Sequence, residues 1–408
     1  MDRLSSSLST GAMLVRAALD GIRVLDVTQV MAGPFCAMLL CDMGADVIKV
    51  EAPQGDSARR MAGGAGDDSA AFNAVNRGKR GIVIDLKTEQ GVQIFRRLSE
   101  SADILIENYR PGVMKRLGLS YEQLSEQNPR LIYASISGYG QTGPSAGKGG
   151  FDLVAQGVSG LMSVTGEPGR VPVKAGVPVT DLGAGLFSVC GILAALQYRE
   201  RTGQGQYIDT ALVDAGFALS VWEATELFSR GTVPGPLGSA HRMSAPYQAI
   251  RCSDGFITLG AANDRLFERL ATVLGHPEWC EDARFSSDGR RVENRSVLAE
   301  EIERVTRSET RSHWLKTLEM EDIPCGPIND YREVMNDPHV QSRDMVVETE
   351  HPILGRIKTL GTPIKMSESP LTPGRPAPLL GQHTDEVLRL VGYNDEELTT
   401  LRNDGAIR

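Results

Sequence analysis

The chain has 408 residues, of which 41% are hydrophobic and 23% charged, and its formal net charge is −9 at pH 7. Single hydrophobic cores stop growing near ~250–300 residues, so this length predicts two domains. The acidic balance, and the lack of an apolar run near the ~18 residues that cross a bilayer, argue against nucleic-acid and membrane partners.

The beginning of the chain differs in composition from the rest. Serines crowd residues 5–9, and the one short apolar stretch that follows is interrupted by Arg16. Because a signal peptide needs a longer apolar segment that ends at a small-residue cleavage site, we predict that residues 1–18 form a disordered extension. The expected location is the cytoplasm, with the mitochondrial matrix as the alternative.

Short apolar runs alternate with helical patterns through the first half of the chain. The expected strands cover residues 22–27, 47–50, 81–85, 103–107 and 131–136. The expected helices cover residues 36–43, 87–100, 121–126, 181–197 and 213–228. Strands that alternate with helices predict a parallel sheet covered by helices on both faces, which is an α/β fold.

The pattern changes after residue 229. Glycine and proline cluster over residues 230–244, which indicates a domain boundary. The elements expected next, which together make a smaller α+β domain, are a strand over 256–259 and helices over 264–274, 292–306 and 312–320. A stiff linker over 323–327 precedes the last expected elements, which are short strands over 345–348 and 356–359 and a helix over 384–391.

Several common catalytic motifs are missing from the sequence. No G-x-G-x-x-G follows the first strand, and neither a G-x-x-x-x-G-K-[ST] loop nor a G-x-S-x-G elbow occurs. The six cysteines are scattered without a C-x-x-C pair, and the six histidines show no H-x-x-x-H spacing, so no metal site is predicted. Nicotinamide binding, P-loop chemistry and an α/β-hydrolase therefore lose their usual support.

Asp181 is the carboxylate of greatest interest. It follows Val177–Thr180, which we predict to be a strand, and it precedes an expected helix. At such a junction the helix dipole and the free backbone amides favour an ionised carboxylate, and the same amides stabilise an oxyanion. The alternative is an ordinary N-cap that satisfies a backbone N–H.

Other charged positions leave two interpretations open. Asp152 follows Gly149 and Gly150, which is typical of a loop that closes over a site or of a solvated turn. The cationic turn over residues 76–80 is expected either to hold peripheral phosphates or to be a solvated loop. Arg110 and Arg116 follow the strand that ends at Glu107, at the end of the sheet where ligands bind, and a surface ion pair is their alternative role.

Motifs spread along residues 19–395 together resemble those of the class III CoA transferases, the group around formyl-CoA transferase and carnitine CoA transferase. The matching segments are Leu19–Asp26, Ala32–Pro34, Gly44–Glu51, Asn76–Arg80, Glu107–Gly112, Ser137–Gly140, Ile323–Pro327 and Leu380–Thr384. Each match is weak alone, and their order and joint presence make the resemblance specific.

The resemblance implies a fold and a set of partners. It implies a Rossmann-like large domain without a dinucleotide site, built from residues 19–229 and 326–408, with a smaller α+β domain and its linkers over 230–325. Two chains of this family thread through each other, so an interlinked homodimer is expected. The expected partners are an acyl-CoA donor and a carboxylic acid acceptor. No permanently bound cofactor is expected, because coenzyme A is part of the substrate.

The resemblance also assigns residues. Asp181 matches the family's catalytic nucleophile, which forms a mixed anhydride and then an aspartyl-CoA thioester. The positions that match contacts to CoA or its thioester are Val30, Ala32, Asn108, Tyr109, Arg116 and Leu117. The candidate substrate positions are Met31, Tyr139, Asp152 and Gly183. Met31 departs from the glutamine of formyl-CoA transferase, which disfavours formyl-CoA and oxalate as the substrate pair.

Two competing functions stay open at this level. The α-methylacyl-CoA racemases of the same superfamily use the histidine of a G-H-D segment as a base, whereas this chain has Phe151 between Gly150 and Asp152. A phenyl ring cannot transfer a proton, so CoA transfer is favoured. The second alternative is a non-catalytic CoA-binding protein. The preferred substrates are succinyl-CoA and a dicarboxylic acid, with Arg59, Arg60 or Arg110 holding the second carboxylate.

Overall fold

A computed structural model describes residues 17–61, 69–371, 373 and 375–408. The predicted extension over residues 1–18 lies outside these ranges except for its last two positions. The chain forms two compact units, here called the large unit and the small unit. The large unit consists of the described residues up to Ser159, Val177–Leu219 and His339–Arg408, and the small unit of Gly160–Gly176 and Ser220–Pro338. The predicted small domain, residues 230–325, lies within the small unit. The domain boundaries expected from the sequence stay predictions.

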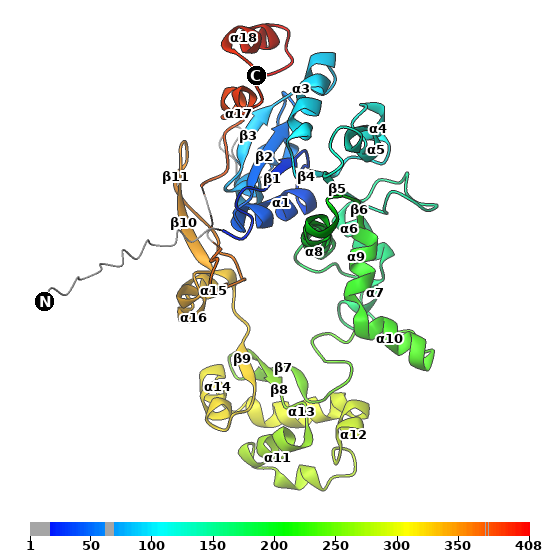
Figure 1. The fold of residues 1–408 in the computed structure, drawn as a ribbon. Helices are drawn as coiled ribbons and strands as arrows, with labels where there is room; N and C mark the ends of the chain where they lie inside the picture. The colour runs from blue at the N-terminus through cyan, green and yellow to red at the C-terminus, as the bar shows by residue number, and fades with distance from the viewer. Residues whose placement is uncertain (1–16, 62–68, 372, 374) are drawn as a thin grey trace, which may run out of the picture. The chain divides into compact units, whose positions relative to one another are not determined.

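The large unit contains a six-stranded sheet in which every ladder is parallel (Figure 1). Its strands, in spatial order, are β3 (Arg80–Val83), β2 (Asp46–Glu51), β1 (Arg23–Asp26), β4 (Ile104–Glu107), β5 (Ile132–Ser137) and β6 (Tyr207–Ala211). This is the order of a doubly wound α/β fold, so the predicted fold class is confirmed. The sequence analysis missed β6.

Helices cover both faces of this sheet because consecutive strand residues point to opposite sides. Val24 joins a core with α1 (Ala32–Asp42) and α8 (Val179–Thr202). Its neighbour Leu25 joins a second core. The helices that contribute to this second core are α3 (Glu89–Glu100), α4 (Val113–Arg116), α5 (Tyr121–Ser125), α17 (Thr384–Leu390) and α18 (Asp395–Asn403).

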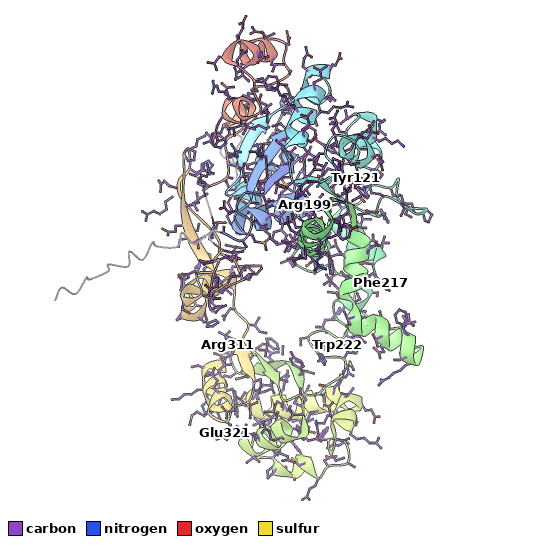
Figure 2. All side chains as sticks on the ribbon, viewed as in Figure 1. Tyr121, Arg199, Phe217, Trp222, Arg311 and Glu321 are labelled. Carbon is purple, nitrogen blue, oxygen red and sulfur yellow. The ribbon has the colours of Figure 1, made fainter. Side chains whose placement is uncertain are left out.

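Helix α8 is longer than the predicted 181–197. An 18-residue window in it has a mean hydropathy of 1.8, and among the described residues it is the one helix long and apolar enough to cross a membrane. Ile192 and Ala195 on this helix are fully buried in the first core, as in the central helix of a globular domain. Near its end, Arg199 (labelled in Figure 2) pairs with Asp103 at 3.0 Å and donates to the Arg130 carbonyl at 3.3 Å.

The C-terminal segment returns to the outer edge of β3. The N–H of His383 donates to the carbonyl of Gly81 at 2.9 Å, and the N–H of Val83 donates to Oγ1 of Thr384 at 3.2 Å. The elements before it are α16 (Pro338–Ser342) and an antiparallel hairpin of β10 (Val346–His351) and β11 (Gly355–Leu360). Both strands of this hairpin and the helix over 384–391 were predicted.

The cationic turn over residues 76–80 is not a solvated loop. Its cations are buried in ion pairs, and they precede or begin β3. The pairs are Arg77 with Asp42 at 2.5 Å, Lys79 with Asp26 at 2.8 Å and Arg80 with Asp46 at 2.6 Å. The solvated-loop alternative is therefore wrong, because partners on β1, β2 and the end of α1 neutralise the charges, and the phosphate role stays a prediction.

The small unit has an antiparallel sheet of β7 (Tyr247–Cys252), β8 (Gly255–Gly260) and β9 (Cys325–Pro327). Its helices are α7 (Leu161–Val164), α10 (Val221–Arg230), α11 (Asp264–Val273), η2 (Pro277–Cys280), α12 (Asp288–Glu293), α13 (Arg295–Thr306), α14 (Arg311–Met320) and α15 (Tyr331–Asn336). Asn294 divides the predicted helix over 292–306. Ser220 divides the predicted helix over 213–228 into α9 (Leu212–Leu219) and α10, because its ψ of 46° is not helical.

Candidate active site

The strand order of the large sheet reverses between β1 and β4. Ligands of such sheets bind beyond the carboxyl ends of the strands at this reversal. A cavity of about 280 Å³ lies there. Its lining residues lie at or just after the ends of β1, β4, β5 and β6, just before α6, and in the first turn of α8. They are Gln29, Val30, Met31, Ala32, Asn108, Tyr109, Arg110, Ile136, Ser137, Gly138, Gly150, Phe151, Asp181 and Leu212.

Asp181 is the third residue of α8 and lines the cavity. Val177–Thr180 contains no strand, so the predicted strand is wrong, and the N-cap residue is Pro178, so the N-cap alternative is wrong too. Burial, and to a smaller extent the charge of Asp152, raises the pKa of Asp181 to about 7. Burial therefore outweighs the expected effect of the helix start, and the carboxyl is about half ionised at neutral pH.

Asp152 connects two helices immediately beside Asp181. It begins α6 (Asp152–Val158), and its Oδ1 accepts hydrogen bonds from the Thr180 N–H at 3.0 Å and from Thr180 Oγ1 at 2.8 Å. The Gln156 side chain donates to Oδ2 at 2.7 Å. The residue thus holds the first turn of α8 through its carboxylate. It does not line the cavity, whereas its neighbour Phe151 does.

The turn after β1 supplies four consecutive lining residues. The Asn108 side chain accepts from the Gln29 N–H at 2.9 Å and donates to the Gln29 carbonyl at 2.8 Å, which ties this turn to the end of β4. Val30 has a φ of 69°, a left-handed conformation that is an outlier for a β-branched residue. A Cβ added at Gly185 would lie 2.9 Å from the Ala32 carbonyl, so glycine there lets α8 approach the turn.

Glu107 and Tyr109 surround Asn108 at the end of β4. Burial raises the pKa of Glu107 to about 7, against the effect of hydrogen bonds from Ser135 Oγ and the Tyr109 N–H. Burial also raises the pKa of the Tyr109 phenol, against the effect of a hydrogen bond with Gln29. Tyr109 is therefore a neutral, hydrogen-bonding wall of the cavity.

The structure brings most predicted site residues together. Val30, Met31, Ala32, Asn108 and Tyr109 line one cavity with Asp181. The remaining predicted positions lie elsewhere in the large unit. Arg116 is exposed on α4, Leu117 packs on the second core, and Tyr139 lies within 6.0 Å of Lys148 Nζ. Gly183 faces Leu219 of α9. The predicted roles of all these residues stay predictions.

Sequence reasoning missed several lining residues, including Gln29, Ser137, Gly138 and Leu212. Each ends a strand of the sheet or follows one within three residues, so the strand ends themselves were the available signal. Gly138 and Gly150 lie so close that a Cβ on either would meet the other's Cα at less than 3 Å. In the described part of the chain, no group of three or more His, Cys, Asp or Glu side chains is arranged to hold a metal ion.

Comparison with known proteins agrees with this architecture. The chain superposes on the crystal structure of a CaiB/BaiF family protein from Brucella suis with a TM-score of 0.82 and 39% sequence identity, covering 92% of this chain and 100% of the other. The sequence model of CoA-transferase family III matches residues 19–384. The chain therefore belongs to CoA-transferase family III.

Two curated relatives with named substrates are similar over nearly their whole length. The succinate–glutarate CoA-transferase of Agrobacterium fabrum is 42% identical over 91% of this chain and 94% of its own. The succinyl-CoA:glutarate CoA-transferase of Homo sapiens is 38% identical over 95% of this chain and 90% of its own. The predicted resemblance is thus confirmed.

Proposed function

We propose that this protein transfers CoA from succinyl-CoA to a short dicarboxylic acid. One observation carries the proposal: Asp181 shares a cavity at the strand reversal with Val30, Ala32, Asn108 and Tyr109, which the family resemblance assigns to the acyl-CoA. The named substrates of the relatives from Agrobacterium fabrum and Homo sapiens support a C4 donor and a C5 acceptor.

The proposed chemistry begins and ends with an acyl-CoA thioester and passes through mixed anhydrides and one aspartyl-CoA thioester. The Asp181 carboxylate attacks the carbonyl of the donor thioester and expels CoA thiolate, which leaves a mixed anhydride. The thiolate attacks the Asp181 carbonyl, so an aspartyl-CoA thioester forms and the donor acid leaves as its carboxylate. The acceptor carboxylate then attacks the aspartyl thioester and expels the thiolate. Attack of the thiolate on the acceptor acyl carbon releases the new acyl-CoA and restores Asp181.

The environment of Asp181 suits a nucleophile. A carboxylate in water is a weak nucleophile because solvent stabilises its charge, and the partly buried position of Asp181 reduces that solvation. The adjacent Asp152 carboxylate works in the same direction, since it destabilises the ionised state by repulsion. Attack on the thioester relieves both costs, because the Asp181 charge passes to the departing thiolate.

Asp181→Ala tests the proposal. The variant should fold and bind CoA, and its transfer rate should fall by ~10³-fold or more, the scale expected for loss of a covalent nucleophile. The measurement is mass spectrometry of the acyl-CoA products from succinyl-CoA and glutarate. In the wild type, hydroxylamine should trap an adduct on Asp181 when succinyl-CoA is present. Substantial transfer by the variant would contradict the mechanism.

Arg110 is the proposed contact for the second carboxylate of the substrate. Of the three predicted arginines, Arg59 is buried and paired with Glu51 at 2.7 Å, and Arg60 donates to the Gln54 carbonyl at 2.6 Å. Only Arg110 of these three lines the cavity with Asp181. Its guanidinium can bind a carboxylate through two parallel hydrogen bonds.

Arg110→Ala should raise the KM for glutarate by about tenfold or more, because a charge-assisted contact contributes ~1.5–3 kcal/mol. A monocarboxylic acceptor such as butyrate should be affected less than threefold, since it lacks the second carboxylate. Arg60→Ala is the matched control and should leave both values unchanged. Equal losses for glutarate and butyrate would show that Arg110 does not select dicarboxylates.

Phe151 supports transfer over racemisation. Its side chain is 77% exposed and lines the cavity at the position where the racemases carry a histidine base. A racemase needs a second group that exchanges protons at the α-carbon, and a phenyl ring has none. Deuterium uptake at the α-carbon of an acyl-CoA, without any acceptor acid, would favour the racemase instead.

Apolar side chains left exposed on the large unit support the proposal of an interlocked homodimer. Phe151, Leu186, Phe187, Phe217 and Leu219 are each at least 43% exposed, on or next to α6, α8 and α9 (Figure 2 labels Phe217). Soluble monomers rarely expose so many large hydrophobic side chains on neighbouring helices. Light scattering after size-exclusion chromatography should give the mass of two chains, and a monomeric mass at micromolar concentration would refute this proposal.

A further inference from the structure

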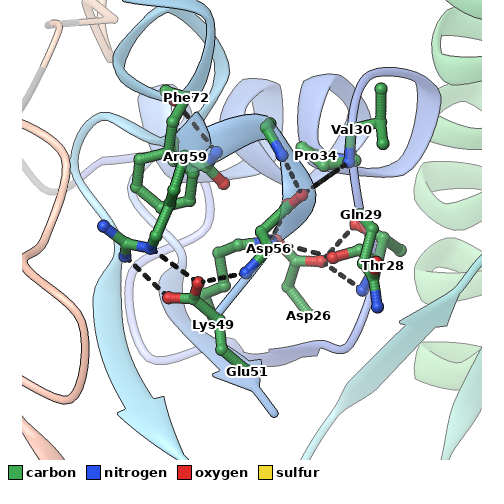
Figure 3. Close-up of polar contacts among 12 residues, drawn as sticks. Asp26, Thr28, Gln29, Val30, Pro34, Lys49, Glu51, Asp56, Arg59 and Phe72 are labelled. Atoms are coloured by element: carbon green, nitrogen blue, oxygen red, sulfur yellow. Dashed lines mark hydrogen bonds and ion pairs between the residues drawn. The ribbon is translucent and has the colours of Figure 1, made fainter. Parts of the chain in front are cut away.

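The turn that lines the cavity after β1 rests on a cluster of buried charges. Figure 3 shows the carboxylate of Asp56 beneath this turn, beside Lys49, Glu51 and Arg59. Lys49 Nζ lies 3.1 Å from Asp56 Oδ2, and both side chains are fully buried. Glu51 accepts from the Asp56 N–H at 2.9 Å and from Arg59 at 2.7 Å, which fixes the segment that carries Asp56.

The contacts of this cluster reach the turn at successive positions. Lys49 Nζ donates to the Thr28 carbonyl at 2.8 Å, and the Thr28 N–H donates to Asp26 at 3.0 Å. The Val30 N–H donates to both carboxylate oxygens of Asp56 at 3.2 Å. Lys79 Nζ, which pairs with Asp26, donates to the Pro34 carbonyl at 3.0 Å. Charged side chains therefore hold the backbone before, within and after the lining turn.

Val30 is the residue of the turn whose backbone conformation has to be enforced by its surroundings. Its φ of 69° is unfavourable for a β-branched residue, and such a conformation persists only when the surroundings enforce it. The contact that holds Val30 in this conformation is the pair of hydrogen bonds from its N–H to the two carboxylate oxygens of Asp56. Asp56 is 1% exposed, so it has no access to a substrate.

We propose that Asp56 is a positioning residue for CoA transfer: through the Val30 N–H it holds Val30–Ala32 in the left-handed turn that shares the cavity with Asp181. Without Asp56, Val30 relaxes to a negative φ, and the Met31 and Ala32 backbone moves away from its place opposite α8. The consequence falls on catalysis more than on CoA binding, because Asn108 and Tyr109, which the resemblance also assigns to CoA, follow β4 and not β1. This inference rests on the proposed function.

Kinetics of Asp56→Ala test the proposal. The kcat for transfer from succinyl-CoA to glutarate should fall by about 10–100-fold, the scale of a displacement of ~1 Å in an active site. The KM for succinyl-CoA should change by less than about threefold if binding is spared. The matched control is Asp42→Ala, which also breaks a buried ion pair, that with Arg77, at the far end of α1. The control should lose thermal stability to a similar extent and keep kcat within about threefold.

A second substitution separates positioning from general damage. In the Asp56→Ala background, Val30→Gly should restore kcat by about tenfold, because glycine adopts a positive φ without strain. Val30→Ala in the same background removes nearly as many atoms and should restore nothing, because alanine prefers a negative φ. Equal recovery by glycine and alanine, or a kcat for Asp56→Ala equal to that of Asp42→Ala, would overturn the proposal.

Asp56→Asn covers the case in which Asp56→Ala does not fold. Its side-chain oxygen still accepts from the Val30 N–H, so kcat should lie between those of the wild type and the alanine variant, and Val30→Gly should again raise it. Failure of glycine to raise kcat in this background would also overturn the proposal. Absence of transfer in the wild type would instead refute the proposed function, so the two failures are distinguishable.

Discussion

The pH dependence of transfer should follow the ionisation of Asp181. Burial and the Asp152 charge raise its pKa to about 7, and the attacking form is the carboxylate. At this pKa the ionised fraction is about 9% at pH 6 and about 91% at pH 8. The value of kcat/KM for succinyl-CoA should therefore rise about tenfold between these pH values. An aspartate at its ordinary pKa of 3.8 would be more than about 99% ionised at both pH values, and the profile would be flat.

Asp152→Asn provides the internal check on this reasoning. The amide oxygen of asparagine can still accept from the Thr180 N–H and hydroxyl, so the start of α8 keeps its support. The negative charge near Asp181 is lost, and the rising limb of the profile should move to lower pH. Initial rates of glutaryl-CoA formation from pH 5.5 to 8.5, corrected for hydrolysis without acceptor, give the profile. A flat profile between pH 6 and 8, or a shift to higher pH in the variant, would refute the reasoning.

Two further predictions concern stability and backbone approach. The pKa of the Asp181 carboxyl is higher in the folded chain than its ordinary 3.8, so folding favours the protonated carboxyl. The stability that this protonated group contributes is fully present below pH 3.8, and it is lost as the pH rises through about 7. Asp181→Asn should therefore raise the free energy of unfolding at pH 8 by on the order of 1–3 kcal/mol and leave it unchanged at pH 4, as measured by urea unfolding. Equal effects at both pH values would contradict this prediction. Gly150→Ala places a Cβ 2.6 Å from the Gly138 Cα and should lower kcat/KM by about 10–100-fold, whereas Gly147→Ala, with no heavy atom within 4 Å, should have no effect. Equal activity of the two glycine variants would disprove the close contact.

The fold was largely predictable because its central strands are buried on both faces. Every residue of Ile104–Glu107 and Ile132–Ser137 is buried, and most of these residues are apolar, which is the pattern of a parallel sheet. Strand β6 escaped prediction because Tyr207 and Asp209 are exposed on it, so Tyr207–Ala211 contains no apolar run. The break at Ser220 was also missed, since both flanking segments have helical patterns.

The position of the candidate site could be predicted from the sequence, whereas the pKa values and ion pairs of its surroundings could not. The resemblance identified Asp181, and the local pattern placed it at a helix start. Its raised pKa depends on burial by segments distant in sequence, which no local pattern reports. Likewise, Arg77 and Lys79 were expected near the surface, where charged residues usually lie. Their partners Asp42 and Asp26 lie 35 and 53 residues away, so only the folded chain reveals the pairing.

The closure of β3 by the C-terminal segment has a consequence for synthesis. The outer edge of β3 bonds with His383 and Thr384, and Arg80 pairs with Glu386, which lies 306 residues later. A ribosome adds ~5–20 residues per second, so this edge waits for about 15–60 s before its cover emerges. An uncovered strand edge is a template for pairing with another chain. The nascent protein therefore carries an open β3 edge throughout this interval, and a chain that terminates before residue 380 never covers it.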